Sequence, residues 1–190
     1  MPRVLTVLLA LALAPAALAP ADALAQGSMS EAFKGFGANR KDPIQIEADS
    51  LEVRDKESVA LFSGNVLVRQ SQTVMKAARL KVFYDSKPGQ EGGTGLPSNQ
   101  QFRRLEAEGR VTISQGDQTV TGEQGWFDMK SEEAMVTGGV VLTQGKNVAR
   151  GERLAIDMKT GQYRLDAAKG SGRVQLILEP AAAKGAGGKP

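Results

Sequence analysis

A short pattern of residues occurs four times in this chain and constrains its fold more than any other feature. It is a glycine followed by aliphatic residues at alternate positions, as in Gly64-Asn65-Val66-Leu67-Val68, and it recurs from Gly109, Gly138 and Gly172. Alternating apolar residues are typical of a β-strand with one buried face. A pattern that recurs along a chain indicates one supersecondary unit that is copied and stacked. The repeat therefore predicts an all-β fold and favours a surface or a channel over a catalytic cleft.

The repeat unit spans 29 residues, because the copy that starts at Gly109 maps without gaps onto the copy that starts at Gly138. Each unit divides into two extended runs, which are joined by tight turns such as Gln115-Gly116-Asp117 and Gln144-Gly145-Lys146. A very small residue lies near the middle of each run, where glycine marks a bulge or a corner between sheets. Long strands that each bend once predict a twisted antiparallel β-jelly roll with two facing sheets, open at both ends. A parallel β-helix is the alternative.

The chain is expected to contain one folded domain between segments of a different character. Residues 1–25 begin with a positive charge, continue with an apolar run too short for a membrane span and end in a small-x-small site, so they predict a cleaved signal peptide. A retained N-terminal anchor is the alternative. Residues 26–41 and 180–190 are predicted to be disordered tails, and the Gly- and Pro-rich residues 86–101 a flexible insertion. The β-jelly-roll domain is thus predicted at 42–179.

Composition excludes several classes of function. The chain has no histidine and no cysteine, which removes the usual general base and the commonest metal ligands. Residues 42–179 contain 18 Lys and Arg against 19 Asp and Glu, a net charge of −1, so the domain lacks the basic face of a nucleic-acid binder. Asp128 and Asp157 recur at strand ends, where we expect them to accept turn hydrogen bonds. We therefore predict no enzyme activity, no catalytic residue, no metal, no cofactor and no nucleic-acid partner.

The alternation places a set of aliphatic residues on one face of the strands. They supply either an ordinary closed core or, if the two sheets splay, an apolar groove that accepts acyl chains, and periodicity alone does not separate these possibilities. Trp126 is expected to fill a wider part of the interior. The predicted groove residues are Ile46, Leu51, Val53, Val66, Val68, Leu80, Val82, Val111, Ile113, Val140, Leu142, Leu154 and Ile156.

An open roll also leaves its first and last strands with unpaired backbone groups, which are templates for pairing with another chain. The first strand is expected at 44–53 and the last at 173–178. Joining the last strand of one copy to the first strand of the next is a head-to-tail contact, and it propagates. The predicted assembly edges comprise Ile44, Gln45 and Ile46 on one side and Val174, Gln175 and Leu176 on the other.

These features together resemble a known family. A signal peptide, the segment Pro43-Ile44-Gln45-Ile46-Glu47-Ala48-Asp49-Ser50-Leu51 and the G-x-V-x-[VIL]-x-Q repeats are similar to those of the OstA-like periplasmic lipopolysaccharide-transport proteins, the LptA family. The resemblance covers 42–179. It implies a periplasmic β-jelly roll whose groove carries the acyl chains of lipid A. It also implies protomers stacked end to end between an inner-membrane transporter component and an outer-membrane assembly protein of similar β-fold. The insertion and the C-terminal tail depart from the family pattern.

The leading hypothesis is a non-enzymatic lipopolysaccharide carrier that shelters acyl chains across the periplasm. Two alternatives stay open on the sequence. One is a membrane-anchored jelly-roll component of the same pathway, which keeps its N-terminal helix. The other is an exported structural β-repeat protein with a closed core.

Overall fold

The computed structural model describes residues 42–85, 102–170 and 172–179. Four segments named above lie outside these residues: the predicted signal peptide at 1–25, the predicted disordered segments at 26–41 and 180–190, and the predicted insertion at 86–101.

Ten β-strands and one turn of 3-10 helix account for the regular structure of the described residues. The strands in the middle of the chain are long, because their alternating apolar residues continue through each bend, and the strands at both ends are short. Their bounds are β1 (Gln45–Glu47), β2 (Ser50–Arg54), η1 (Asp55–Glu57), β3 (Val59–Gln70), β4 (Thr73–Tyr84), β5 (Phe102–Gln115), β6 (Gln118–Asp128), β7 (Glu133–Gln144), β8 (Asn147–Asp157), β9 (Gln162–Asp166) and β10 (Gln175–Ile177).

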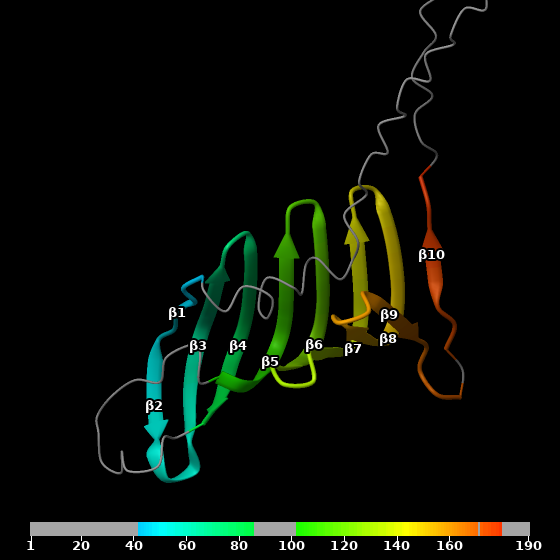
Figure 1. Ribbon diagram of the computed structural model, residues 1–190. Coiled ribbons are helices and arrows are strands. Elements are labelled where there is room, and N and C mark those ends of the chain that lie inside the picture. Colours follow the sequence, from blue (N-terminus) through cyan, green and yellow to red (C-terminus); the bar gives the residue numbers. More distant parts are fainter. Residues whose placement is uncertain (1–41, 86–101, 171, 180–190) are drawn as a thin grey trace, which may run out of the picture.

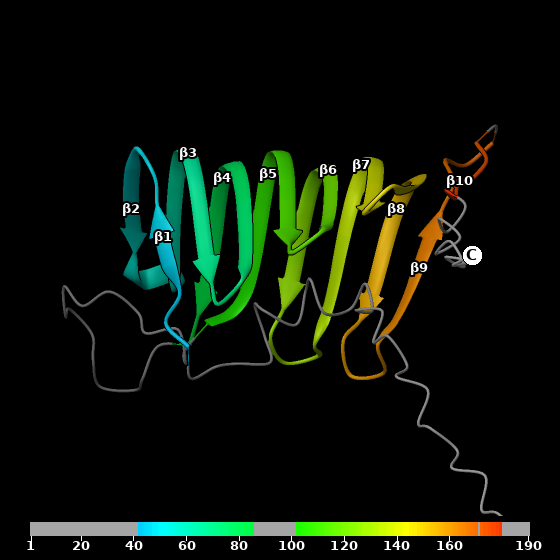
Figure 2. The same cartoon turned by 90° about the horizontal axis from the view of Figure 1, so that it is seen from above.

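The strands form one antiparallel sheet in the order β1-β3-β4-β5-β6-β7-β8-β10 (Figures 1 and 2). Strand β2 pairs with β3 beside β1, and β9 pairs with β8 beside β10, so each end of the sheet has two short strands in place of one long one. From β3 to β8 each strand pairs with the next along the chain, as expected for a stack of hairpins.

The sheet is folded along a corner that crosses the middle of the long strands. The register shifts there, for example between Glu108 and Val111, which marks a bulge. Gly64, Gly109 and Gly138 have φ of +80°, +80° and +86° at this corner. A left-handed backbone followed by a bulge turns the strand sharply, and glycine adopts it without a steric penalty.

The corner divides the sheet into two halves that face each other across the interior (Figure 1). We call them the upper half and the lower half. The upper half consists of β1, 66–70, 73–77, 111–115, 118–122, 140–144, 147–151 and β10, and the lower half consists of β2, 59–63, 79–84, 102–108, 124–128, 133–137, 153–157 and β9.

These observations confirm the predicted fold class, an antiparallel β-jelly roll that is not closed. Every pairing between described strands is antiparallel, so the parallel β-helix alternative is wrong. The two facing layers are halves of one continuous sheet, since each long strand runs through both. The small residues in the middle of the runs mark corners, as predicted.

The expectation for Trp126 is wrong. Trp126 pairs with Glu106 and Met135, whereas its neighbour Phe127 pairs with the buried residues Leu105 and Ala134. Side chains alternate between faces along a strand, so Trp126 lies on the outer face. The guanidinium of Arg104 lies 4.4 Å from the centroid of its ring, an arrangement that stabilises a half-buried aromatic residue.

Candidate functional site: the apolar interior

The interior is lined by rows of side chains that run across the strands. Cross-strand pairing aligns Val68 with Met75, Met75 with Ile113, Ile113 with Val120, and Val120 with Leu142 in the upper half. All five are buried. Directly opposed apolar residues stabilise a sheet and leave a continuous apolar strip along one face.

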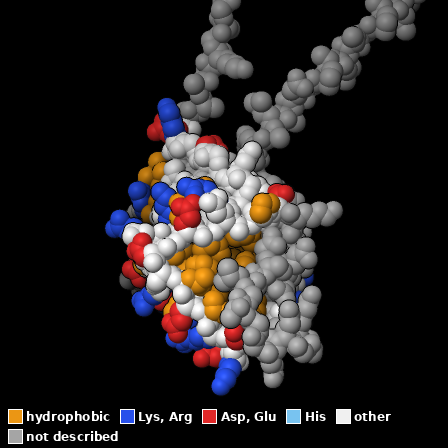
Figure 3. All heavy atoms as spheres, turned by 90° about the vertical axis from the view of Figure 1, so that its left-hand side faces the viewer, with side chains coloured by type: hydrophobic (Ala, Val, Ile, Leu, Met, Phe, Trp, Pro, Cys, Tyr) orange, Lys and Arg blue, Asp and Glu red, His pale blue; other side chains and the backbone are white. Residues whose placement is uncertain are grey.

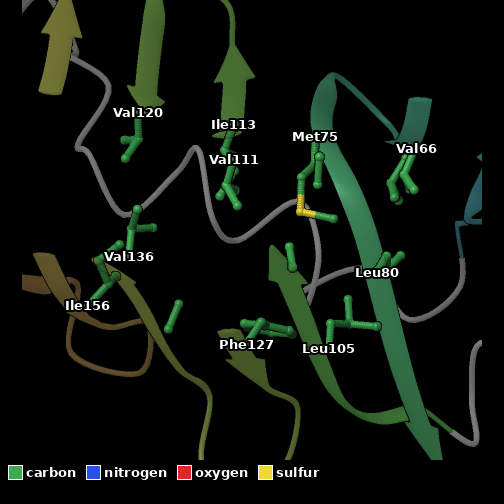
Figure 4. Close-up of a cluster of buried hydrophobic side chains, with 14 of the residues drawn as sticks. Val66, Met75, Leu80, Leu105, Val111, Ile113, Val120, Phe127, Val136 and Ile156 are labelled. Atoms are coloured by element: carbon green, nitrogen blue, oxygen red, sulfur yellow. The ribbon is translucent and has the colours of Figure 1, made fainter. Parts of the chain in front are cut away.

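The lower half contributes matching rows. Val82 pairs with Leu105, Leu105 with Phe127, and Phe127 with Ala134, again with every member buried. Met75 and Val111 of the upper half face Leu105 and Phe127 of the lower half (Figure 4). The two halves therefore hold one shared hydrophobic cluster between them.

The structure brings most of the predicted groove residues into this cluster. Ile46 is only partly buried and packs against its edge. Leu51 and Val53 also point inward but belong to the end strand β2, and they are 43% and 37% exposed. The ten that are buried together are Val66, Val68, Leu80, Val82, Val111, Ile113, Val140, Leu142, Leu154 and Ile156.

Sequence reasoning missed several residues that line the same space, among them Met75, Val120, Phe127 and Val136. Six of the thirteen predicted groove residues follow a glycine of the repeated pattern in steps of two, and this pattern marks alternate strands. Counting backward in steps of two from the small residue in the middle of the partner strand, from Ala77 to Met75 and from Gly122 to Val120, finds two of them by the same alternation.

The middle of the interior is nearly filled. It holds a cavity of about 30 Å³, whereas binding sites for small molecules measure about 300–1,000 Å³. The cavity exists because three inward positions carry small residues: Ala107, Gly125 and Ala134. The other residues around it are Met75, Leu105, Val111, Ile113, Phe127 and Val136 on the inner face, together with Trp126 and Met135, which also border it although their positions have the outward phase.

Both ends of the interior are open. Hydrophobic side chains lie in the middle of the end formed by β1 and β2, framed by charged residues (Figure 3). At the other end Tyr163, Leu176 and Leu178 are 51%, 63% and 64% exposed. The continuous exposed apolar surface at the β1 and β2 end is of the kind that indicates contact with another molecule.

The predicted assembly edges lie at these ends. Gln45 and Ile46 belong to β1, and Ile44 immediately precedes it. Gln175 and Leu176 belong to β10, whereas Val174 lies just outside that strand. The predicted first strand is divided into β1 and β2, and the predicted last strand shares its edge with β9, which the prediction omitted.

The two recurring aspartates, Asp128 and Asp157, bond to the backbone of turns. Asp128 accepts hydrogen bonds from the backbone N–H groups of Lys130 and Ser131, each at 2.9 Å, and Asp157 accepts them from Lys159 and Thr160. These bonds lower the pKa of both carboxyls, as expected for turn residues. No group of three or more metal-ligating side chains occurs among the described residues.

An unclosed β-jelly roll with an apolar interior is the architecture of a binding scaffold, and comparison with known proteins gives its family. The family model described as "LptA/(LptD N-terminal domain) LPS transport protein" matches residues 45–162. The chain belongs to this family, which consists of transport proteins and not enzymes. The predicted resemblance to OstA-like lipopolysaccharide-transport proteins is confirmed at this level.

The chain is also similar to individual proteins of known sequence. The chain is 40% identical over 170 residues to an uncharacterized protein of Rhizobium meliloti (strain 1021), which covers 89% of this chain and 88% of that protein. It is 24% identical over 135 residues to the LPS-assembly protein LptD of Yersinia enterocolitica, covering 71% of this chain but only 13% of LptD.

A solved structure shares the fold. The crystal structure of LptH, the LptA homologous periplasmic component of the lipopolysaccharide transport device of Pseudomonas aeruginosa, superposes with a TM-score of 0.59. It covers 75% of this chain and 99% of LptH at 19% identity, so the likeness concerns the fold. In the part of the chain that the structure describes, no helix has the length and apolarity to cross a membrane.

Proposed function

We propose that this chain is an LptA-like periplasmic carrier of lipopolysaccharide, in which the apolar interior shelters the acyl chains of lipid A. The observation that carries the proposal is an apolar interior that opens at both ends, in a member of a lipopolysaccharide-transport family. The apolar rows run from one end of the roll to the other, which suits a lipid that enters at one end and leaves at the other.

Loading requires the two halves to separate, because the cavity of about 30 Å³ is far smaller than an acyl chain. Backbone pairing runs only along the sheet, so the facing halves meet through side chains. Bending at the glycine-containing corner opens the interior without breaking the hydrogen-bonded ladder. The exposed Leu51 and Val53 at one end are the apolar surface that a lipid meets first.

The first test places a charge in the interior. Ile113→Asp puts a carboxylate between Met75 and Val120, where an unpaired charge is strongly unfavourable against apolar surface. Thr112→Asp is the matched control, because Thr112 precedes Ile113 on the same strand and points outward. We expect the Ile113 variant to fold and lose lipopolysaccharide in a pull-down, and the Thr112 variant to retain it.

Thermal melts of both variants accompany the pull-down. Unfolding of Ile113→Asp, by a penalty of several kcal/mol that is comparable with the stability of a whole domain, would refute the groove in favour of a closed core. Retention of lipopolysaccharide by the folded variant would contradict the proposal directly.

Head-to-tail association forms the second part of the proposal. Strands β1 and β10 lie at opposite edges of the sheet, and the apolar side chains beside them are exposed or only half-buried. Pairing of β10 of one copy with β1 of the next continues the sheet and joins the two interiors. The same edges would meet an inner-membrane transporter component and an outer-membrane assembly protein of similar fold.

The chain has no cysteine, which allows a clean test of this contact. Single cysteines at Gln45 and Gln175, mixed and oxidised, should give dimers, and the double variant should give a ladder of oligomers. A strictly monomeric product at high concentration, with the protein folded, would contradict the head-to-tail contact. Sequencing of the mature N-terminus tests the membrane-anchored alternative, which predicts that Met1 is retained.

A further inference from the structure

One row of inward-facing side chains is polar, although it directly adjoins the apolar rows. It lies at the upper rim, the free edge of the upper half where its hairpins turn. We call it the amide row, and its members are Gln70, Thr73, Gln115, Gln118, Gln144 and Asn147.

The amide row is continuous from β3 to β8. Gln70 pairs with Thr73, Thr73 with Gln115, Gln115 with Gln118, Gln118 with Gln144, and Gln144 with Asn147. Neighbouring strands lie about 4.8 Å apart, so the six positions extend over roughly 24 Å. The row thus runs parallel to the apolar rows along much of the roll.

All six positions share the inward phase of their strands, and three of the side chains are buried while the other three are partly exposed. Gln70, Thr73 and Gln118 are 2%, 0% and 5% exposed, and each lies two residues from a buried apolar residue of the same strand. Buried amides need hydrogen-bond partners, and one bond joins two members of the row while another joins the row to a neighbouring backbone carbonyl. The Thr73 hydroxyl donates to Oε1 of Gln115 at 3.2 Å, and Nε2 of Gln70 donates to the backbone carbonyl of Asp42 at 3.1 Å.

The opposite rim has a different chemistry. The inward or buried residues at the free edge of the lower half include Tyr84, Met129 and Met158, which belong to the hydrophobic cluster. If the interior only had to exclude water, apolar residues would suffice on both rims. The asymmetry gives a guest molecule one polar border and one apolar border.

We propose that the amide row is a hydrogen-bonding track for the amide and 3-hydroxyl groups that join acyl chains to an amino-sugar headgroup. This inference deepens the proposed function and rests on it. Alkyl chains would lie on the apolar rows, and the polar linkages at their heads would reach the adjoining row. A glutamine amide both donates and accepts, so it can exchange a bond to its neighbour for an equivalent bond to the lipid.

A repeating row also suits movement along the interior. Each position offers a neutral hydrogen-bonding group one strand spacing further on, an amide at five positions and a hydroxyl at Thr73, so a lipid that shifts along the roll replaces one hydrogen bond with the next. A single strong polar site would instead hold the lipid in one place.

The test compares two probes on matched variants. Gln118→Met removes one amide of the row with little change in side-chain length, and Gln124→Met makes the same change at an exposed, outward position of the same strand. The probes are lipid A, which carries amide-linked 3-hydroxyacyl chains, and tetradecanoic acid, which has neither group. We expect Gln118→Met to weaken binding of lipid A about tenfold and to leave binding of tetradecanoic acid within about twofold. Gln124→Met should change neither affinity.

The other possible results distinguish a lipid-binding role of the amide row from a purely structural one. Equal loss of both probes, or retention of lipid A binding, would show that the row only completes the rim of the fold. If Gln118→Met does not fold, Gln144→Met provides the same comparison, because Gln144 pairs with Gln118 and is only partly buried. Failure of the wild-type chain to bind lipid A would overturn the proposed function itself, and is distinguished from failure of the track by that wild-type measurement.

Discussion

Gly125 offers the sharpest test of whether the interior holds a lipid. It lies at an inward position of β6, opposite Ala107 and Val136, and lines the small cavity. A Cβ atom added there would lie 3.6 Å from Cγ1 of Val111 and 3.7 Å from Cγ2 of Val136, which are ordinary contact distances. Gly125→Ala therefore fits the structure as it stands.

The expected gain in stability has two sources. Burial of one additional methyl group contributes about 0.8 kcal/mol, and the reduced freedom of the unfolded chain contributes about 0.4–1 kcal/mol. Together they give about 1–2 kcal/mol, which corresponds to a rise in Tm of roughly 4–8 °C for a domain of this size. Differential scanning calorimetry measures the shift directly.

Gly125→Leu extends the same perturbation to function. Its longer side chain reaches into the space between the two halves, where overpacking costs about 1–3 kcal/mol and offsets the gain from burial. We expect a folded protein whose affinity for lipopolysaccharide falls about tenfold or more, because the leucine occupies the path of an acyl chain. Gln124→Leu, which adds the same side chain to the outer face of the strand, should leave the affinity unchanged.

The reasoning fails if Gly125→Leu is folded and binds lipopolysaccharide as well as the wild-type chain does. That result would place the lipid outside the middle of the roll. A decrease in Tm for Gly125→Ala would separately show that the space beside Gly125 is already filled.

Two further predictions concern the corner and the turns. Gly138→Ala should lower the free energy of unfolding by about 2–3 kcal/mol in urea denaturation, because Gly138 has φ of +86° and its added Cβ would lie 2.6 Å from Cβ of Glu123. Gly139→Ala is the control, since Gly139 has φ of +58° with open space around it, and this change should cost about 1 kcal/mol. Equal effects of the two changes would contradict the role assigned to the close approach at Gly138. Asp128→Ala should destabilise the protein at neutral pH, because hydrogen bonds from the backbone N–H groups of Ser131 and Lys130 hold the pKa of Asp128 below its usual range. A group whose pKa is lowered by folding stabilises the folded state above its unfolded pKa of about 3.9. The difference in Tm between wild type and variant should therefore shrink as the pH falls below that value. A difference in Tm that is constant with pH would contradict the role assigned to Asp128.

The sequence contained enough information to predict the strands and their corners. The residues that follow Gly64, Gly109 and Gly138 alternate as buried strands do, and each of these glycines has the left-handed backbone that a bend requires. Periodicity reports which face a residue occupies, and it therefore identified ten buried residues of the interior correctly.

Periodicity does not report how far a position lies from the end of the sheet. Leu51 and Val53 have the same inward phase as Val66, yet they are exposed because no further strand covers them. It also gave no account of Trp126, whose size suggested an interior position although its phase places it outside. In the sequence alone, members of the amide row are recognisable only as residues beside turns. The continuity of the row depends on pairing between strands that are distant in sequence.

The folded sheet has a consequence for how proteins of this architecture change in length. Each hairpin of 29 residues contributes to both walls at once, so the loss or gain of one repeat shortens or lengthens the enclosed passage by two strand spacings, about 9.6 Å. The walls stay in register because every strand carries its own corner. One repeat therefore adds a segment of the passage together with the side chains that line it. A longer passage can be made from a longer chain as readily as from additional protomers.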